Sequence, residues 1–311
     1  MDSEAKIVDF NLIEEGEHIR PRQKILFINA EPGGTAIFSI ADMMLGEEAA
    51  TEDELRDKFK NKDKGVDQFR EMILSNIESS PKENERIEER EFKAKLPLPE
   101  NLEGIEAIVI GGSRFAAYQR DIPGKELAPW KKELVDLIKA AVEKNIPMLG
   151  ICFGEELLAE ALGGQVVKMK SKEGKELWDY GWELVKKMPA ALGDPVLKGL
   201  PDEFAAPVNN HDIVVRLPEG AVEILDGAMG VMGFRWEKKG RSLAWGLQFH
   251  PEGSKKTREK HLNEEKTQTK MREYGLEPEE IAKIGDRYDL AITKIFSNFR
   301  LFTRSHYLKS H

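Results

Sequence analysis

Cysteine is almost absent from this chain, which has a single one, Cys152, in 311 residues. One thiol excludes an intramolecular disulfide framework and any zinc site built from several cysteines. Long apolar runs are also missing, since none approaches the roughly 20 residues needed to cross a bilayer. The first 20 residues contain neither the basic nor the apolar segment of a secretory leader. These absences predict a soluble, cytoplasmic protein that does not bind membranes.

An excess of basic residues is lacking as well. The chain has 47 Lys and Arg against 56 Asp and Glu, which gives a net charge of −9. Because an acidic surface repels the phosphate backbone, we expect no nucleic-acid partner. Hydrophobic residues make up 40% of the chain. That is enough apolar material for a sizeable core, and it excludes a globally disordered chain.

Nucleotide-binding signatures are absent too. The sequence has no G-x-x-x-x-G-K-[ST] phosphate loop and no Ser-Gly-Gly-x-Asp-Ser pyrophosphatase loop. The glycine doublets Gly33-Gly34 and Gly111-Gly112 lack the spacing of a dinucleotide fingerprint. The chain therefore has no recognisable site at which ATP could activate an acceptor. We predict no cofactor and no metal site.

Along the chain, short apolar runs alternate with longer amphipathic ones. Strands are expected at 24–30, 105–110 and 147–151, and helices at 129–145 and 155–162. A series in which strands alternate with helices predicts an α/β fold, with a central, mostly parallel sheet flanked by helices. The chain after Gly164 changes to strands joined by turns, expected at 165–169, 177–185, 213–217, 222–225, 231–236 and 243–249.

We expect a single domain spanning 1–311, in which two segments are additions to the α/β fold. Residues 47–93 carry 15 acidic and 10 basic side chains on an approximate helical stripe. We expect a helical insertion whose charged faces contact solvent, with partner docking as the alternative. Residues 253–311 form a helical C-terminal extension that ends in one helix, predicted from about Pro278 to Phe302.

The most informative segment joins a predicted strand to a predicted helix through Gly150-Ile-Cys152-Phe-Gly154. This is the G-x-nucleophile-x-G elbow with cysteine in place of serine, and its glycines avoid clashes in a tight turn. A helix N-terminus favours a thiolate over a thiol. The alternative is a buried cysteine that acts as a small hydrophobic residue between two packing glycines.

A second motif supplies the partners that a thiol nucleophile needs. His250 and Glu252 lie two residues apart on an extended segment, so both side chains project to the same side. A thiol nucleophile needs a base, and the base needs a carboxylate to fix its tautomer. The two motifs together favour a catalytic site over a structural histidine.

The pair GICFG at 150–154 and QFHPE at 248–252 resembles the class I glutamine amidotransferases. The likeness is greatest to the glutaminase domain of GMP synthetase and its stand-alone relatives, and it covers roughly residues 105–252. Residues 23–46 match more loosely, while the insertion and the C-terminal extension lie outside it. The resemblance implies the flavodoxin-like architecture of that family.

The resemblance also implies roles for individual residues. Cys152 would attack the side-chain amide of glutamine, with His250 as the base and Glu252 as the carboxylate that orients it. Backbone N–H groups of Gly112 and Phe153 would form the oxyanion hole. The products would be ammonia and a γ-glutamyl thioester, which water converts to glutamate. Because the chain has no acceptor site, a separate ATP-dependent synthetase would receive the ammonia. The oligomeric state stays open.

One departure from the family concerns substrate binding. Family members usually read C-x-G-x-Q, whereas this chain has Glu156 at the glutamine position, preceded by Glu155. The related γ-glutamyl hydrolases resemble C-x-G-x-E, so a γ-glutamyl peptide or conjugate is the alternative substrate. A catalytically silent binding or regulatory protein is a third possibility. His211, in a loop near the active-site rim of the family, is a further candidate for substrate binding.

Overall fold

A computed structural model describes residues 5–10, 23–28, 98, 101–113, 115–117 and 129–310. The insertion predicted at 47–93 lies outside the described residues, so its helices stay a prediction.

The described strands form one large sheet and one small sheet. The large sheet has nine strands, in the order β1 (Ala5–Phe10), β2 (Gln23–Ile28), β3 (Ala107–Ile110), β4 (Met148–Ile151), β11 (Arg241–Leu247), β10 (Gly230–Lys238), β9 (Ala221–Gly227), β6 (Asp179–Lys187) and β7 (Glu203–Asn210). Strands β2, β3, β4 and β11 pair in parallel, and the other neighbours pair antiparallel. The small sheet pairs β5 (Gln165–Lys168) with β8 (Asp212–Arg216).

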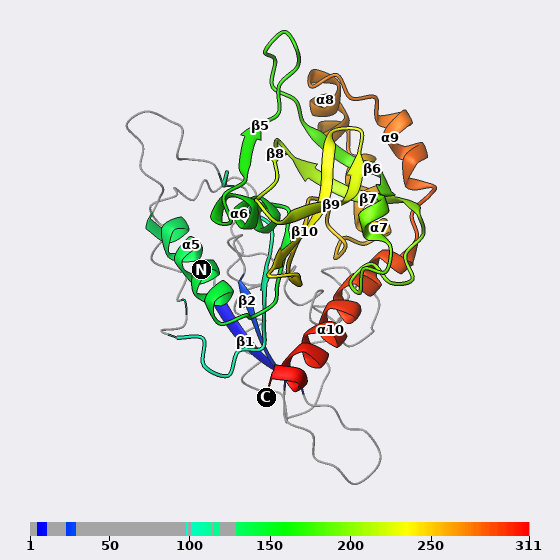
Figure 1. The fold of residues 1–311 in the computed structure, drawn as a ribbon. Coiled ribbons are helices and arrows are strands. Elements are labelled where there is room, and N and C mark those ends of the chain that lie inside the picture. The colour runs from blue at the N-terminus through cyan, green and yellow to red at the C-terminus, as the bar shows by residue number, and fades with distance from the viewer. Residues whose placement is uncertain are drawn as a thin grey trace, which may run out of the picture.

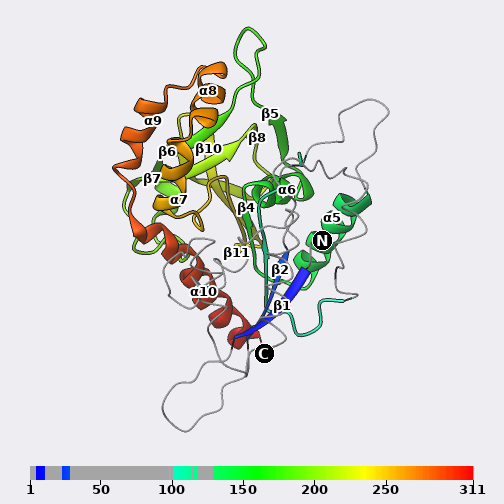
Figure 2. The same ribbon diagram turned by 180° about the vertical axis from the view of Figure 1, so that it is seen from behind.

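Helices cover both faces of the parallel strands (Figures 1 and 2). Helices α5 (Pro129–Glu143) and α6 (Phe153–Ala161) lie on one face, where Ile108 and Ile110 join their apolar core. Helix α10 (Lys294–Ser310) lies on the opposite face, where Val109 packs in a second core with Phe299. The predicted α/β fold with a parallel centre is confirmed. None of the helices in the described ranges combines the length and apolar character needed to cross a membrane.

Strand β7 is not among the strands expected from the sequence, and it contains Pro207. Proline cannot donate to a sheet ladder and is tolerated mainly in edge strands. In the large sheet β7 is the last strand, and β6 is the strand with which it pairs. The edge position therefore explains how this strand can contain a proline.

The C-terminal extension forms α7 (Lys255–Leu262), α8 (Glu265–Glu273), α9 (Pro278–Gly285) and α10. The prediction of one helix from Pro278 to Phe302 is wrong. The chain breaks after α9, and Asp289 accepts a hydrogen bond from Ala291 N at 2.7 Å to start a short 3-10 turn. Side-chain oxygens of aspartate compete with the helical ladder in this way. Helix α10 packs on the core, since Ile295 and Phe299 are fully buried.

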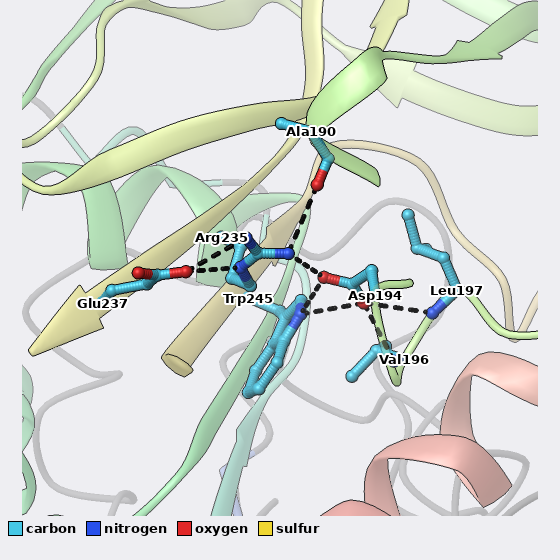
Figure 3. Close-up of polar contacts among 7 residues, drawn as sticks. All are labelled: Ala190, Asp194, Val196, Leu197, Arg235, Glu237 and Trp245. Atoms are coloured by element: carbon cyan, nitrogen blue, oxygen red, sulfur yellow. Dashed lines mark hydrogen bonds and ion pairs between the residues drawn. The ribbon is translucent and has the colours of Figure 1, made fainter. Parts of the chain in front are cut away.

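A buried carboxylate holds the loop between β6 and β7 against the sheet (Figure 3). Asp194 accepts hydrogen bonds from Arg235 Nη1 at 2.8 Å and from Trp245 Nε1 at 3.1 Å. It also accepts bonds from the backbone N–H groups of Val196 at 2.9 Å and Leu197 at 3.2 Å. Because Trp245 lies on β11, this cluster braces the strand that leads to His250.

Asp194→Ala is expected to lower the free energy of unfolding by about 3–5 kcal/mol, because it removes a fully buried carboxylate and leaves the buried indole N–H of Trp245 and two backbone N–H groups without their acceptor. Glu237→Ala is the matched control, since Glu237 also pairs with Arg235, at 3.0 Å, but is partly exposed. That variant should cost about 1 kcal/mol or less. Urea unfolding of both variants checks the difference. Equal losses would mean that Asp194 is not the anchor of the loop.

Candidate active site

The elbow predicted from the sequence lies between β4 and α6. Cys152 has φ 53° and ψ −111°, a strained conformation for a residue with a side chain. Its backbone N–H donates to the carbonyl oxygen of Leu247, the last residue of β11, at 2.7 Å. A strained cysteine between a buried strand and a helix is the geometry of a nucleophile elbow.

Two glycines allow the backbone segments of the elbow to touch. A Cβ atom on Gly150 would lie 2.3 Å from the carbonyl oxygen of Gly154, and one on Gly154 would lie 2.1 Å from that of Ile110. The first turn of α6 therefore packs on the ends of β3 and β4 with no side chain between them. This contact fixes where Cys152 sits relative to the sheet.

The second motif meets the elbow at Gly112. His250 Nδ1 lies 2.7 Å from Glu252 Oε1, as the spacing of the two residues predicts. A Cβ atom on Gly112 would lie 3.0 Å from His250 Cε1 and 3.9 Å from Cys152 Sγ. The imidazole and the thiol therefore share Gly112 as a neighbour, although they are 98 residues apart in the chain. With Nδ1 bonded to the carboxylate, Nε2 is the nitrogen left to accept a proton.

The sequence predicts that Cys152 favours the thiolate, whereas its environment in the structure favours the neutral thiol. Burial raises the pKa of Cys152 well above its usual value, and the nearby carboxyl groups of Glu156, Glu252 and Glu155 add to the rise. A hydrogen bond from the Phe153 N–H lowers the pKa but does not offset the other causes. A neutral thiol that loses its proton only during attack fits a site with an adjacent base.

The two glutamates after the elbow are both buried, and they point to different neighbours. Glu155 packs against β11, where a Cβ atom on Gly246 would lie 2.4 Å from its Cγ. Its two carboxyl oxygens have no hydrogen-bond partner among the described residues. Burial and then the charge of Glu156 raise its pKa well above the usual value. Glu155 thus lies against the sheet, and its predicted contact with substrate stays a prediction.

Glu156 lies among polar groups from three other segments of the chain. Its Oε1 accepts a hydrogen bond from Gln248 Nε2 at 3.3 Å. Burial raises the pKa of Glu156 to about 8, with a further rise from Asp212 and smaller opposing effects of Gln248 and Lys131. Gln248 is the first residue of the QFHPE motif, and Asp212 follows His211. Lys131 is a fully buried lysine in the first turn of α5, which no pattern in the sequence marks.

His211 lies in the turn between β7 and β8, and its contacts are aromatic. Its ring stacks on Trp178 with 5.8 Å between centroids, and Nδ1 lies 3.0 Å from the carbonyl oxygen of Leu177. Tyr274 is a third neighbour, at 5.5 Å. None of these partners belongs to the elbow or to the His250 segment. The proposed role of His211 in binding substrate therefore stays untested.

A metal ion at this site would need several ligand side chains close together. Across the ranges that the structure describes, no group of three or more His, Cys, Asp or Glu residues is arranged to hold a metal ion.

Comparisons with known proteins agree on one family. The model of the glutamine amidotransferase class-I family matches residues 69–268. The glutamine-hydrolysing GMP synthase of Thermotoga maritima is 29% identical over 170 residues, which cover 54% of this chain and 29% of that enzyme. This chain therefore spans less than a third of the length of that relative.

Two further proteins extend the comparison. One subunit of the glutamine-hydrolysing GMP synthase of Methanococcus vannielii is 32% identical over 116 residues, which cover 37% of this chain and 54% of that protein. Among solved structures, SMU.1228c aligns with a TM-score of 0.50 at 16% identity, covering 67% of this chain and 84% of that protein. At that identity the structural likeness bears on the fold alone.

Proposed function

This chain belongs to the class-I glutamine amidotransferase family, and we propose that it hydrolyses the side-chain amide of glutamine through a thioester on Cys152. The observation that carries the proposal is the meeting of Cys152, Gly112 and His250 in one place, with Glu252 bonded to the imidazole. The high pKa of the thiol makes a neighbouring base necessary.

In the proposed reaction, Cys152 Sγ attacks the amide carbon while its proton passes to His250 Nε2. Glu252 fixes the tautomer of the imidazole and stabilises the imidazolium that forms. The imidazolium then protonates the leaving nitrogen, so ammonia departs and a γ-glutamyl thioester remains. Attack by water, with its proton taken by the same imidazole, releases glutamate and restores the thiol.

The negative charge that develops on the amide oxygen needs donors near Cys152. We assign this role to the backbone N–H groups of Phe153, which already bonds to the thiol, and Gly112. Each such donor contributes about 3–4 kcal/mol to stabilisation of the transition state. The absence of a side chain at Gly112 allows the substrate to approach that backbone.

The names of the relatives support a proposal for the use of the ammonia. Two of the proteins named above are GMP synthases, one of them a separate subunit. We propose that this chain passes its ammonia to a separate ATP-dependent synthetase. Low glutaminase activity of the chain alone, raised by that partner, would fit this role.

A second candidate, hydrolysis of a γ-glutamyl peptide or conjugate, is favoured by Glu156 and Asp212. Above pH 8, where Glu156 is mostly ionised, its charge next to the elbow would repel the α-carboxylate of free glutamine. The same charge would attract a cationic group on a larger γ-glutamyl substrate.

One assay separates the candidates. Purified protein is incubated with glutamine and, in parallel, with γ-glutamyl dipeptides, and ammonia and glutamate are measured. Ammonia from glutamine supports the amidotransferase, and glutamate from the dipeptides alone supports the hydrolase. No product from either substrate, with or without candidate synthetases, would contradict the proposal and leave a catalytically silent binding protein.

Glu156 gives this site a predicted pH dependence. With a pKa of about 8, its carboxyl group is mostly protonated at pH 7 and ionised at pH 9. We therefore expect the KM for glutamine to rise as the pH increases through 8. Glu156→Gln carries no charge at either pH, so its KM for glutamine should not change with pH. At pH 9 its KM should be about 5- to 150-fold lower than that of the wild type, which corresponds to about 1–3 kcal/mol of removed charge repulsion.

The matched control for this prediction is Glu133→Gln, which removes the same charge from an exposed position on α5. It should retain the pH profile of the wild type. A KM that rises equally in Glu156→Gln and in the wild type would show that another group causes the dependence.

A further inference from the structure

A buried hydrogen bond joins the segment of the nucleophile to the segment of the base. Gln248 Nε2 donates to Glu156 Oε1 at 3.3 Å, and the two residues are only 1% and 3% exposed. Because both partners are buried, water competes little for either of them. Gln248 lies two residues before His250, and Glu156 lies four residues after Cys152. The bond therefore connects the two motifs of the site through side chains that have no part in the proposed chemical steps.

Backbone contacts close a ring around this bond. The N–H of Cys152 donates to the carbonyl oxygen of Leu247 at 2.7 Å, and Leu247 precedes Gln248 in the chain. The N–H of Glu156 in turn donates to the carbonyl oxygen of Cys152 at 3.1 Å. The N–H of Gln248 donates to Met232 O on β10, also at 3.1 Å. The backbone thus fixes both ends of the side-chain bond next to the elbow.

The amide of Gln248 engages only one of its two polar ends. Its Oε1 is buried and has no hydrogen-bond partner in the described part of the chain, whereas its Nε2 bonds to Glu156. A buried acceptor without a donor lowers stability. A donor to a carboxyl group favours its ionised form, and Gln248 lowers the pKa of Glu156 against the larger effect of burial. The bond to Glu156 is therefore what an amide supplies here and an apolar side chain would not.

The other charged groups that face Glu156 come from two further elements and from its own helix. Asp212, the first residue of β8, raises the pKa of Glu156, and Lys131 of α5 opposes that rise. The charge of Glu156 raises the pKa of its neighbour Glu155 and that of the Cys152 thiol. Ionisation of Glu156 is therefore felt at the nucleophile.

We propose that Gln248 is a positioning residue, whose amide holds the carboxyl group of Glu156 beside the elbow and thereby lets Glu156 select among γ-glutamyl substrates by charge. The inference rests on the proposed effect of Glu156 on glutamine binding. Without the amide donor, the buried carboxyl group ionises less readily and is no longer tied to the segment of His250. Repulsion of the α-carboxylate of free glutamine should then begin at a higher pH.

The first test measures KM and kcat for glutamine against pH in Gln248→Met, which removes the donor and nearly keeps the volume. We expect the rise in KM to move upward by about one pH unit, because a hydrogen bond to a charged group contributes about that much. At pH 8.5 the KM should be about two- to threefold lower than that of the wild type, with kcat close to the wild-type value.

The matched control is Gln268→Met on α8. It removes an amide that donates to Leu262 O at 3.0 Å within the C-terminal extension. Its pH profile should equal that of the wild type.

Alkylation of Cys152 by iodoacetamide is a second readout that needs no substrate, and the chain has no other thiol. At pH 7, where Glu156 is mostly protonated, Gln248→Met should react at the wild-type rate. At pH 8.5 the variant should react about two- to threefold faster, because its Glu156 stays largely neutral and raises the pKa of the thiol less. A site that is merely loosened would react faster at both pH values.

A double-mutant cycle separates positioning from a structural role. In a Glu156→Gln background, Gln248→Met should change neither KM nor alkylation further, because the charge on which it acts is gone. Wild-type pH profiles in folded Gln248→Met, faster alkylation at both pH values, or effects that add in full would overturn the proposal. Gln248→Leu replaces the methionine variant if circular dichroism shows that the latter unfolds. The predicted pH-dependent alkylation in a protein that hydrolyses nothing would uphold Gln248 while the proposed function fails.

Discussion

Cys152→Ala is expected to lower kcat/KM for the best substrate by about 10⁴- to 10⁶-fold, because no other thiol in the chain can replace it. His250→Ala should lose nearly as much, since the base and the nucleophile act as one unit. Glu252→Ala should lose less, because the imidazole stays present without its orienting carboxylate. Initial rates of glutamate release measure all three.

The matched control for these variants is His261→Ala, which removes an exposed imidazole on α7. Its activity should equal that of the wild type. Additive losses in a Cys152→Ala/His250→Ala double variant would contradict a single catalytic unit. Full activity in Cys152→Ala would show that the reaction takes place elsewhere.

Gly154→Ala should have the largest effect on stability, on the order of 3–5 kcal/mol or failure to fold. The added methyl group would lie 2.1 Å from the carbonyl oxygen of Ile110 and 2.8 Å from its carbonyl carbon, and backbone atoms cannot move aside as a flexible side chain can. Gly111→Ala is the control, because its Cβ atom would make only an ordinary contact at 3.6 Å with Ile28 O.

Urea unfolding of the two glycine variants tests this account of the elbow. We expect the midpoint of Gly154→Ala to fall far below that of Gly111→Ala. Similar midpoints would mean that α6 can move away from β3 at little cost. The elbow would then not be fixed by contact between backbone segments.

The parts of the site that could be predicted are those that the sequence encodes locally. Gly150 and Gly154 flank Cys152, and the two-residue spacing of His250 and Glu252 predicts their 2.7 Å contact. The parallel strands were also predictable, because their apolar runs are short, continuous and separated by helical periodicity. Each of these signals lies within a few residues of chain.

The parts that could not be predicted depend on contacts between distant segments. Arg258 meets Tyr180 across 78 residues, and α7 is too charged to suggest a buried face. The raised pKa of Cys152 comes first from burial, whereas the sequence indicated only the helix N-terminus. Strand β7 depends on its edge position in the finished sheet to tolerate Pro207. In each case the outcome depends on tertiary contacts, which local sequence preferences do not encode.

The central claim is that Cys152 attacks a γ-glutamyl carbonyl carbon. A γ-glutamyl diazoketone, a glutamine analogue that alkylates the thiol attacking its carbonyl, tests that claim most directly. Peptide mapping by mass spectrometry should find one label per chain, on Cys152, with loss of hydrolysis in proportion to labelling and protection by the true substrate. The label should be absent from His250→Ala at the same exposure time. Hydrolysis that continues in fully labelled protein, or a label on any other residue, would contradict the account.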